Sequence, residues 1–93
     1  MARYVAEMLH GNRPAEGEYH FEAEDDLLTH SPMTVLRTFL QWVVDHSALD
    51  HIDYEVNAAM KNEEHGVVTA LGTLHFDKDG KQPFTAMISR APD

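Results

Sequence analysis

A chain of 93 residues that is 43% hydrophobic and 25% charged has the composition of one globular domain, spanning residues 1–93, with no room for a second core. The absence of cysteine excludes disulfides, thiolate metal ligands and a thiol nucleophile. Sixteen acidic against seven basic residues give a net charge of −9 with histidine neutral, which repels phosphate backbones, so we expect no nucleic-acid partner.

Two strands are predicted at the start of the chain. Residues 3–10 have the composition of a strand with imperfect alternation, and the glycines, asparagine and proline of 11–17 predict a turn. The next segment, 18–24, alternates strictly, as a strand with one buried face does. Its apolar positions are Tyr19, Phe21 and Ala23, and its polar positions are Glu18, His20, Glu22 and Glu24. We therefore expect the two segments to pair as a hairpin.

A single helix is predicted from Ser31 to about His46. Serine at the N-cap accepts a hydrogen bond from a backbone N–H, and Pro32 at the first helical position lacks the N–H that would otherwise be unpaired. The apolar side chains spread over roughly 200° of the helix surface, whereas a helix that packs on one sheet needs about 100°. They are Met33, Val35, Leu36, Phe39, Leu40, Trp42, Val43 and Val44. We therefore expect the helix to be buried on two sides. The sheet covers one side, and loops that include Leu27 and Leu28, or another copy of the chain, cover the second.

Three more strands follow the helix. Alternating residues at 52–61, 67–76 and 84–89 predict the strands, and the turn-forming residues of 62–66 and 77–81 predict hairpins between them. The predicted fold class is α+β, with a single amphipathic helix packed on an antiparallel sheet of four to five strands in the order ββαβββ.

The register between the third and fourth strands follows from keeping one face apolar. A three-residue loop at 63–65 does so, whereas a two-residue loop would reverse the faces of one strand. On the core side we expect Ile52, Tyr54, Val56, Ala58 and Met60, opposite Phe76, Leu74, Gly72, Ala70 and Val68. On the outer side we expect Asp53 opposite His75, and Leu71 beside Met87. The outer face then has a small apolar centre that consists of Val67, Leu71, Met87 and Ala59.

Five side chains on the predicted outer face are candidates for acid–base catalysis. They are His20, Glu22, Asp53, Glu55 and His75. Carboxylate–imidazole pairs can transfer protons, but a flat solvated sheet face neither desolvates such groups nor excludes water. Antiparallel strands also commonly carry carboxylates on their solvent face, so surface residues without a catalytic role are the alternative interpretation.

The seven histidines raise the question of a metal site. Zinc sites usually combine three or four ligands at short fixed spacings, such as His-x3-His on a helix. The His-x3-His spacing does not occur among His10, His20, His30, His46, His51, His65 and His75. The sequence also lacks a phosphate loop, a dinucleotide fingerprint and a Gly-x-Ser-x-Gly elbow. We therefore expect no metal and no cofactor.

A homo-oligomer interface is the leading functional expectation. Trp42 lies at the margin of the broad apolar stripe, where it is either a core border or an interface residue, since aromatic residues are enriched at interfaces. The candidate interface residues are Val35, Phe39, Trp42, Leu71 and Met87. The sequence thus predicts a small non-enzymatic binding or accessory domain that acts as a homo-oligomer, with a dimer as the expected state.

Two other functions stay open. One is a small enzyme with its site at a subunit interface, using a histidine and a carboxylate from the five candidates above. The other is an antitoxin-like or inhibitor protein that binds a basic protein partner, for which segment 16–26 supplies six acids and no base. Neither an apolar N-terminal segment nor a run of about 18 apolar residues is present, so we expect no membrane association and a cytoplasmic location.

Overall fold

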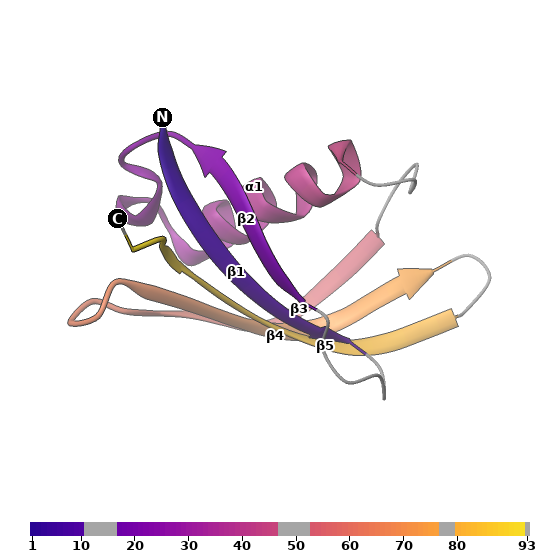
Figure 1. Cartoon of the computed structure of the whole chain (residues 1–93). Coiled ribbons are helices and arrows are strands. Elements are labelled where there is room, and N and C mark those ends of the chain that lie inside the picture. Colours follow the sequence, from indigo (N-terminus) through magenta and orange to yellow (C-terminus); the bar gives the residue numbers. More distant parts are fainter. Residues whose placement is uncertain (11–16, 47–52, 77–79, 93) are drawn as a thin grey trace.

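The computed structural model describes residues 1–10, 17–46, 53–76 and 80–92 (Figure 1). The strands are β1 (Ala2–His10), β2 (Glu18–Ala23), β3 (Asp53–Asn62), β4 (Val67–Phe76) and β5 (Gly80–Arg90), and the helices are the 3₁₀ helix η1 (Leu27–Thr29) and the α-helix α1 (Pro32–Asp45). The α+β class, with one helix on an antiparallel sheet and the order ββαβββ, is confirmed, with η1 as an addition. The turns expected within 11–16 and 77–79, and Ile52 as a core residue, lie outside the described residues.

The sheet is antiparallel throughout and has the strand order β2-β1-β5-β4-β3. β5 lies at the centre because the last strand returns to pair with the first, which places Tyr4 opposite Arg90 and His10 opposite Phe84. The two termini consequently lie on the same side of the molecule (Figure 1). β2 and β3 are therefore the two edges of the sheet.

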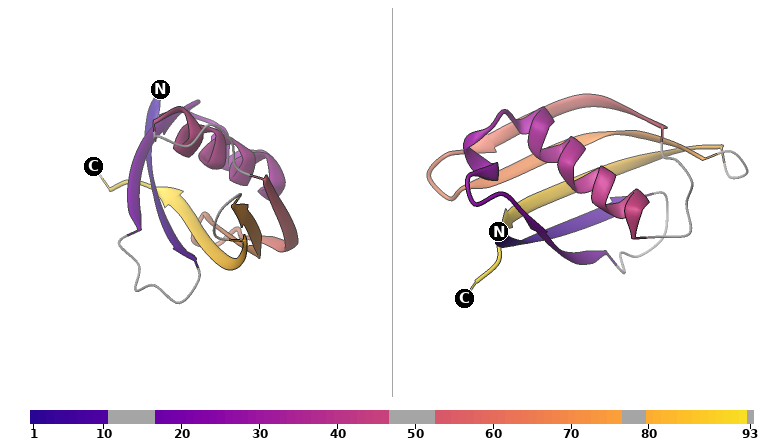
Figure 2. Two further views of the ribbon diagram at one scale, coloured as in Figure 1. Left: turned by 90° about the vertical axis from the view of Figure 1, so that its right-hand side faces the viewer. Right: turned by 90° about the horizontal axis from the view of Figure 1, so that it is seen from above.

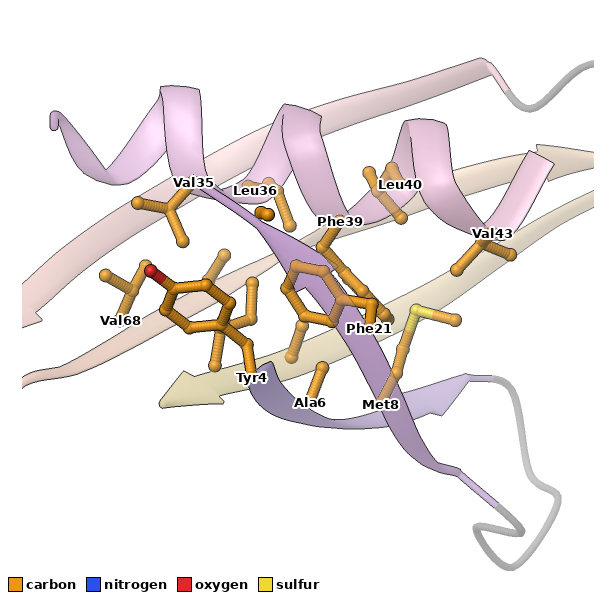
Figure 3. Close-up of a cluster of buried hydrophobic side chains, with 14 of the residues drawn as sticks. Tyr4, Ala6, Met8, Phe21, Val35, Leu36, Phe39, Leu40, Val43 and Val68 are labelled. Atoms are coloured by element: carbon orange, nitrogen blue, oxygen red, sulfur yellow. The ribbon is translucent and has the colours of Figure 1, made fainter. Parts of the chain in front are cut away.

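The sheet curves around α1, so that the helix lies in its concave face. Seen end on, β1 and β2 rise on one side of the helix and β3 rises on the other (Figure 2, left). The side chains between the helix and the sheet form the core, and Figure 3 shows the part of it around Tyr4, Phe21 and Phe39. The Phe21 ring centroid lies 5.5 Å from that of Tyr4 and 5.5 Å from that of Phe39. Aromatic packing of this kind joins both strands of the first hairpin to the helix.

The helix α1 begins and ends close to where the sequence predicts. The Thr34 backbone N–H donates to Ser31 Oγ at 3.3 Å, Pro32 follows the cap, and the His46 N–H donates to the Trp42 carbonyl oxygen at 3.0 Å. The buried side chains of the helix are Val35, Leu36, Phe39, Leu40 and Val43. Among the described helical residues, no segment is both long enough and apolar enough to cross a bilayer.

The chain itself covers the broad apolar stripe of α1. Val35 and Phe39, which the sequence offers as interface residues, are fully buried. Tyr19 and Phe21 of β2 lie with ring centroids 5.6 and 5.5 Å from that of Phe39, and Leu27 of η1 is also buried. The second side of α1 is thus covered by β1 and β2, which the curvature of the sheet brings over the helix, and by η1. Val35 and Phe39 therefore present no surface to another copy of the chain.

β3 and β4 pair in the expected register only as far as Val56. Asp53 lies opposite His75, as predicted, but beyond Val56 the pairing shifts by one residue and Met60 lies opposite Thr69. Such a β-bulge adds one residue to one strand, and it reverses the faces of all the residues that follow.

The residues of β3 whose faces the bulge reverses include three apolar side chains. Ala59, expected on the outer side, packs against the core, whereas Ala58 and Met60, expected in the core, lie on the outer side. A Cβ at Gly72 would lie 2.0 Å from the backbone oxygen of Glu55, so the two strands approach each other very closely just before the shift. Glycine in a strand often marks a close approach of this kind.

Two boundaries also differ from the prediction. The turn between β3 and β4 has four residues, 63–66, rather than three, and Gly66, with φ of 65°, donates its N–H to the Asn62 carbonyl oxygen at 2.8 Å. β5 begins at Gly80, so that Pro83 lies within the strand rather than at its start, where the sequence predicts it. Its missing N–H is tolerated in a part of β5 that pairs only with β4 among the described residues.

Candidate functional site

The five candidate catalytic residues separate into two groups. His20 and Glu22 lie on β2, Asp53 and Glu55 lie on β3, and His75 lies on β4. β2 and β3 are opposite edges of the sheet, four strand spacings apart, which at about 4.8 Å each is roughly 19 Å along the sheet. The structure therefore brings no single site together from all five.

The first group consists of Asp53, Glu55 and His75 on the outer face. The imidazole Nε2 of His75 lies 3.6 Å from Glu55 Oε1, which is ion-pair distance but too long for a hydrogen bond. Nε2 is shielded from solvent and has no hydrogen-bond partner among the described residues. Register places Asp53 and Lys81 on either side of His75. When the imidazole is protonated, this group can hold a cross-strand ion pair.

The second group lies at the edge formed by β2, beside the end of α1. His20 Nε2 lies 2.9 Å from Glu18 Oε1, so the ring N–H donates to this carboxylate. A pocket of about 400 Å³ adjoins it, lined by Arg3, His20, Phe21, Glu22, Trp42 and His46. The Trp42 and His46 rings stack at 4.5 Å between centroids and at 20°. The pocket thus has an aromatic wall and a polar rim.

His46 belongs to this pocket, although the sequence patterns described above do not predict it there. Its Nδ1 lies 2.9 Å from the Trp42 carbonyl oxygen, which can only accept, so Nδ1 carries the proton. The signal in the sequence is the i, i+4 spacing of Trp42 and His46, because residues four apart are neighbours on a helix surface.

A third cluster lies where β2 ends and η1 begins, and the sequence patterns described above do not predict it either. The ligand atoms of Glu24, Asp26 and His30 lie within 4.8 Å of one another, and His30 Nε2 is 3.7 Å from Asp26 Oδ1 and 3.9 Å from Glu24 Oε2. Carboxylates with an imidazole suit a divalent transition metal. All three side chains are exposed, so they could hold such an ion only loosely. Its signal is the spacing Glu-x-Asp-x3-His in an acidic turn.

The outer face of the sheet carries an apolar surface, which we call the outer patch. It consists of Leu9, Met60, Leu71 and Met87, which are 51%, 69%, 46% and 48% exposed. Met87 and Met60 flank Thr69 in one row across the strands, and Leu9 and Leu71 flank Thr85 in the next row. Leu71 and Met87 are therefore diagonal neighbours rather than the direct neighbours that the sequence predicts.

Only half of the outer patch was visible in the sequence. The sequence predicts Leu71 and Met87 on the outer face, whereas it predicts no face for Leu9 and predicts Met60 in the core. Trp42, the remaining interface candidate, is half-buried against Tyr19 and Phe21 beside the β2 edge, away from the patch.

No protein-family model, curated protein or solved structure matches this chain. The sites themselves therefore carry the functional inference. Among them, the outer patch is the one whose exposure has an energetic cost in water, since burying apolar surface gains about 25 cal/mol per Å². The carboxylates of the His–carboxylate groups are largely exposed and can remain hydrated without a partner.

Proposed function

We propose that this chain is a non-enzymatic binding domain that forms a homodimer through the outer patch. The observation that supports the proposal is the exposure of four large apolar side chains on one continuous surface. The patch spans four strands and two rows, which at about 4.8 Å between strands and about 6.8 Å between rows corresponds to roughly 260 Å² of projected area, with Thr69 and Thr85 between the apolar side chains. Apolar patches of this size are often functional contact sites.

A second copy of the chain is the proposed occupant. Met87 and Leu71 lie on β5 and β4, near the middle of the sheet, so two convex outer faces would meet along these strands. A twofold contact needs only one surface that complements itself, and an apolar patch with threonines between its members is suited to this. Glu7, opposite Met87, and Glu55, in the row beyond Leu71, would remain at the solvated rim.

An acid–base enzyme receives less support from the same geometry. Its candidate residues separate into one group on β2 and another on β3 and β4, and the Glu22 and Glu55 side chains are exposed. Proton transfer benefits from groups that are desolvated and placed around one substrate position. The binding domain is therefore the function that we put forward.

Sedimentation velocity of patch variants tests the dimer. Met87→Lys replaces a central apolar side chain by a charged one, and it makes the net charge less negative by one unit, so general repulsion between copies decreases. We expect the dimer to weaken about tenfold or more, because a charge at the centre of an apolar contact is desolvated without a partner.

The matched control is Gln41→Lys, which makes the same charge change on the exposed surface of α1, on the opposite side of the sheet. There we expect no loss of the dimer. Equal dimer populations in Met87→Lys and in the wild-type chain would contradict the proposal, as would a wild-type chain that remains monomeric at high concentration.

A further inference from the structure

The edge strand β2 directs some of its backbone hydrogen-bonding groups away from the sheet. It pairs with β1 on one side and has no strand on the other side among the described residues. The Met8 N–H donates to the Gly17 carbonyl oxygen at 2.9 Å, and this contact fixes the alternation of the pair. Alternate residues of β2, beginning with Gly17, therefore direct their backbone groups to β1. The N–H and C=O groups of Glu18, His20 and Glu22 point away from the sheet.

The pocket beside α1 adjoins this edge. His20 and Glu22 belong to both, since they line the pocket and carry the outward backbone groups. The far wall of the pocket is the half-buried Trp42, whose ring centroid is 6.1 Å from that of Phe21. A strand added to the edge would place alternate side chains against this wall, which is how strand-addition sites obtain specificity.

The negative charges around the β2 edge favour a basic binding partner. Glu7 of β1 and Glu18 of β2 lie directly opposite each other, an arrangement of like charges that destabilises a sheet. Glu22 faces Arg3 across the strands, and the exposed Glu24 and Asp26 follow at the end of β2. A cation brought near Glu18 would relieve the repulsion from Glu7.

The same charges disfavour a second copy of the chain at this edge. If two β2 strands paired antiparallel across a twofold axis, the register that pairs most outward groups would centre on His20. Glu18 would then lie opposite Glu22 of the partner subunit, twice over. Natural edge strands commonly use charges of this kind to prevent self-pairing.

We propose that the β2 edge binds an extended segment of a partner protein in which basic and apolar residues alternate. The segment adds a sixth strand to the sheet through Glu18, His20 and Glu22. Its basic side chains lie beside the Glu18 and Glu22 carboxylates on the outer face, and an apolar side chain on its other face packs against Phe21 and Trp42. This surface is separate from the outer patch, so the partner and a second copy of the chain can bind together.

Trp42 is the only tryptophan in the chain, so its fluorescence reports on the pocket directly. The probe is a capped eight-residue peptide of alternating arginine and valine, titrated into the full chain. We expect a saturable change in Trp42 emission with this peptide and none with the matching glutamate–valine peptide. A peptide N-methylated on the backbone nitrogen of each arginine keeps its charge but cannot donate the backbone hydrogen bonds that would pair it with β2. It should therefore bind about tenfold or more weakly.

Two variants separate local from general attraction. Glu18→Gln should weaken binding of the arginine–valine peptide by about twofold to fivefold, the range of exposed ion pairs. Glu64→Gln, an equal charge change in the exposed turn between β3 and β4, should leave it unchanged. Leu71→Lys, in the outer patch, should also leave it unchanged, which separates this site from the dimer surface.

Three results would overturn the proposal. These are no fluorescence change at millimolar peptide, equal affinity of the N-methylated peptide, and equal effects of Glu18→Gln and Glu64→Gln.

Discussion

The two faces of the central strands carry similar side chains in opposite surroundings. On the inner face of β4 and β5, Val68, Leu74 and Ile88 are almost completely inaccessible to solvent. On the outer face of the same strands, Leu71 and Met87 are about half exposed, although each lies one to three residues from a buried neighbour. Burial in this molecule therefore depends on the face of the sheet and much less on the residue type. The inner face holds the monomer together, and the outer face remains available for a partner.

The largest expected difference between the faces comes from one substitution made on both sides of β4. Leu74→Ala removes a buried side chain, and it should lower the free energy of unfolding by about 2–5 kcal/mol because it leaves a cavity. Leu71→Ala removes an exposed one and should cost less than about 0.5 kcal/mol in dilute solution. Urea unfolding at low protein concentration measures both. Similar losses would mean that the outer patch is part of the fold of the monomer.

A smaller effect is expected at an exposed position that does support the monomer. Ser31→Ala removes the oxygen that accepts from the Thr34 N–H, and it should cost about 1 kcal/mol in urea unfolding. Ser31→Asp keeps a side-chain acceptor at the N-cap, so it should retain most of the stability. If Ser31→Ala has the same free energy of unfolding as the wild-type chain, the N-cap hydrogen bond does not stabilise the monomer. Burial alone then determines which residues stabilise it.

Salt should act in opposite directions on the two proposed contacts. Each copy carries a net charge of −9, so raising sodium chloride screens repulsion between copies and should strengthen the dimer by about twofold to threefold. The arginine–valine peptide is held at the β2 edge partly by ion pairs, so its affinity should decrease. Sedimentation and Trp42 fluorescence over the same salt series measure the two effects. A dimer that dissociates as salt rises would indicate ion pairs in place of an apolar contact.

The elements of this fold follow from local signals, which is why the sequence predicts them. Ser31 and Pro32 mark the start of α1, and strict alternation marks β2. The bulge in β3 lies next to the close approach of Gly72 to Glu55, and although a glycine in a strand can signal such an approach, it does not indicate where the facing strand gains a residue. For this reason, the alternation of β3 predicts Met60 on the wrong face of the sheet.

The shape of the sheet was equally invisible in the sequence. Alternation assigns side chains to faces but does not say how far a sheet curves, so the broad apolar stripe of the helix predicts loops or a second copy of the chain packed on its second side. Curvature brings Tyr19 and Phe21 over Phe39 instead. The separation of His20 from His75 depends on strand order, which is set by the return of β5 to the side of β1. Strand order is a long-range property that pairwise turns do not determine.

Methyl NMR of the five methionines tests the central claim most directly, because these residues sample both sides of the sheet. Met8 is buried in the core and Met33 is half-buried on α1, whereas Met60 and Met87 lie in the outer patch and Met1 is exposed at the terminus. As protein concentration rises, the Met60 and Met87 methyl signals should shift or broaden together, while those of Met1, Met8 and Met33 stay constant. Constant Met60 and Met87 signals at concentrations where sedimentation shows a dimer would place the contact elsewhere and contradict this account.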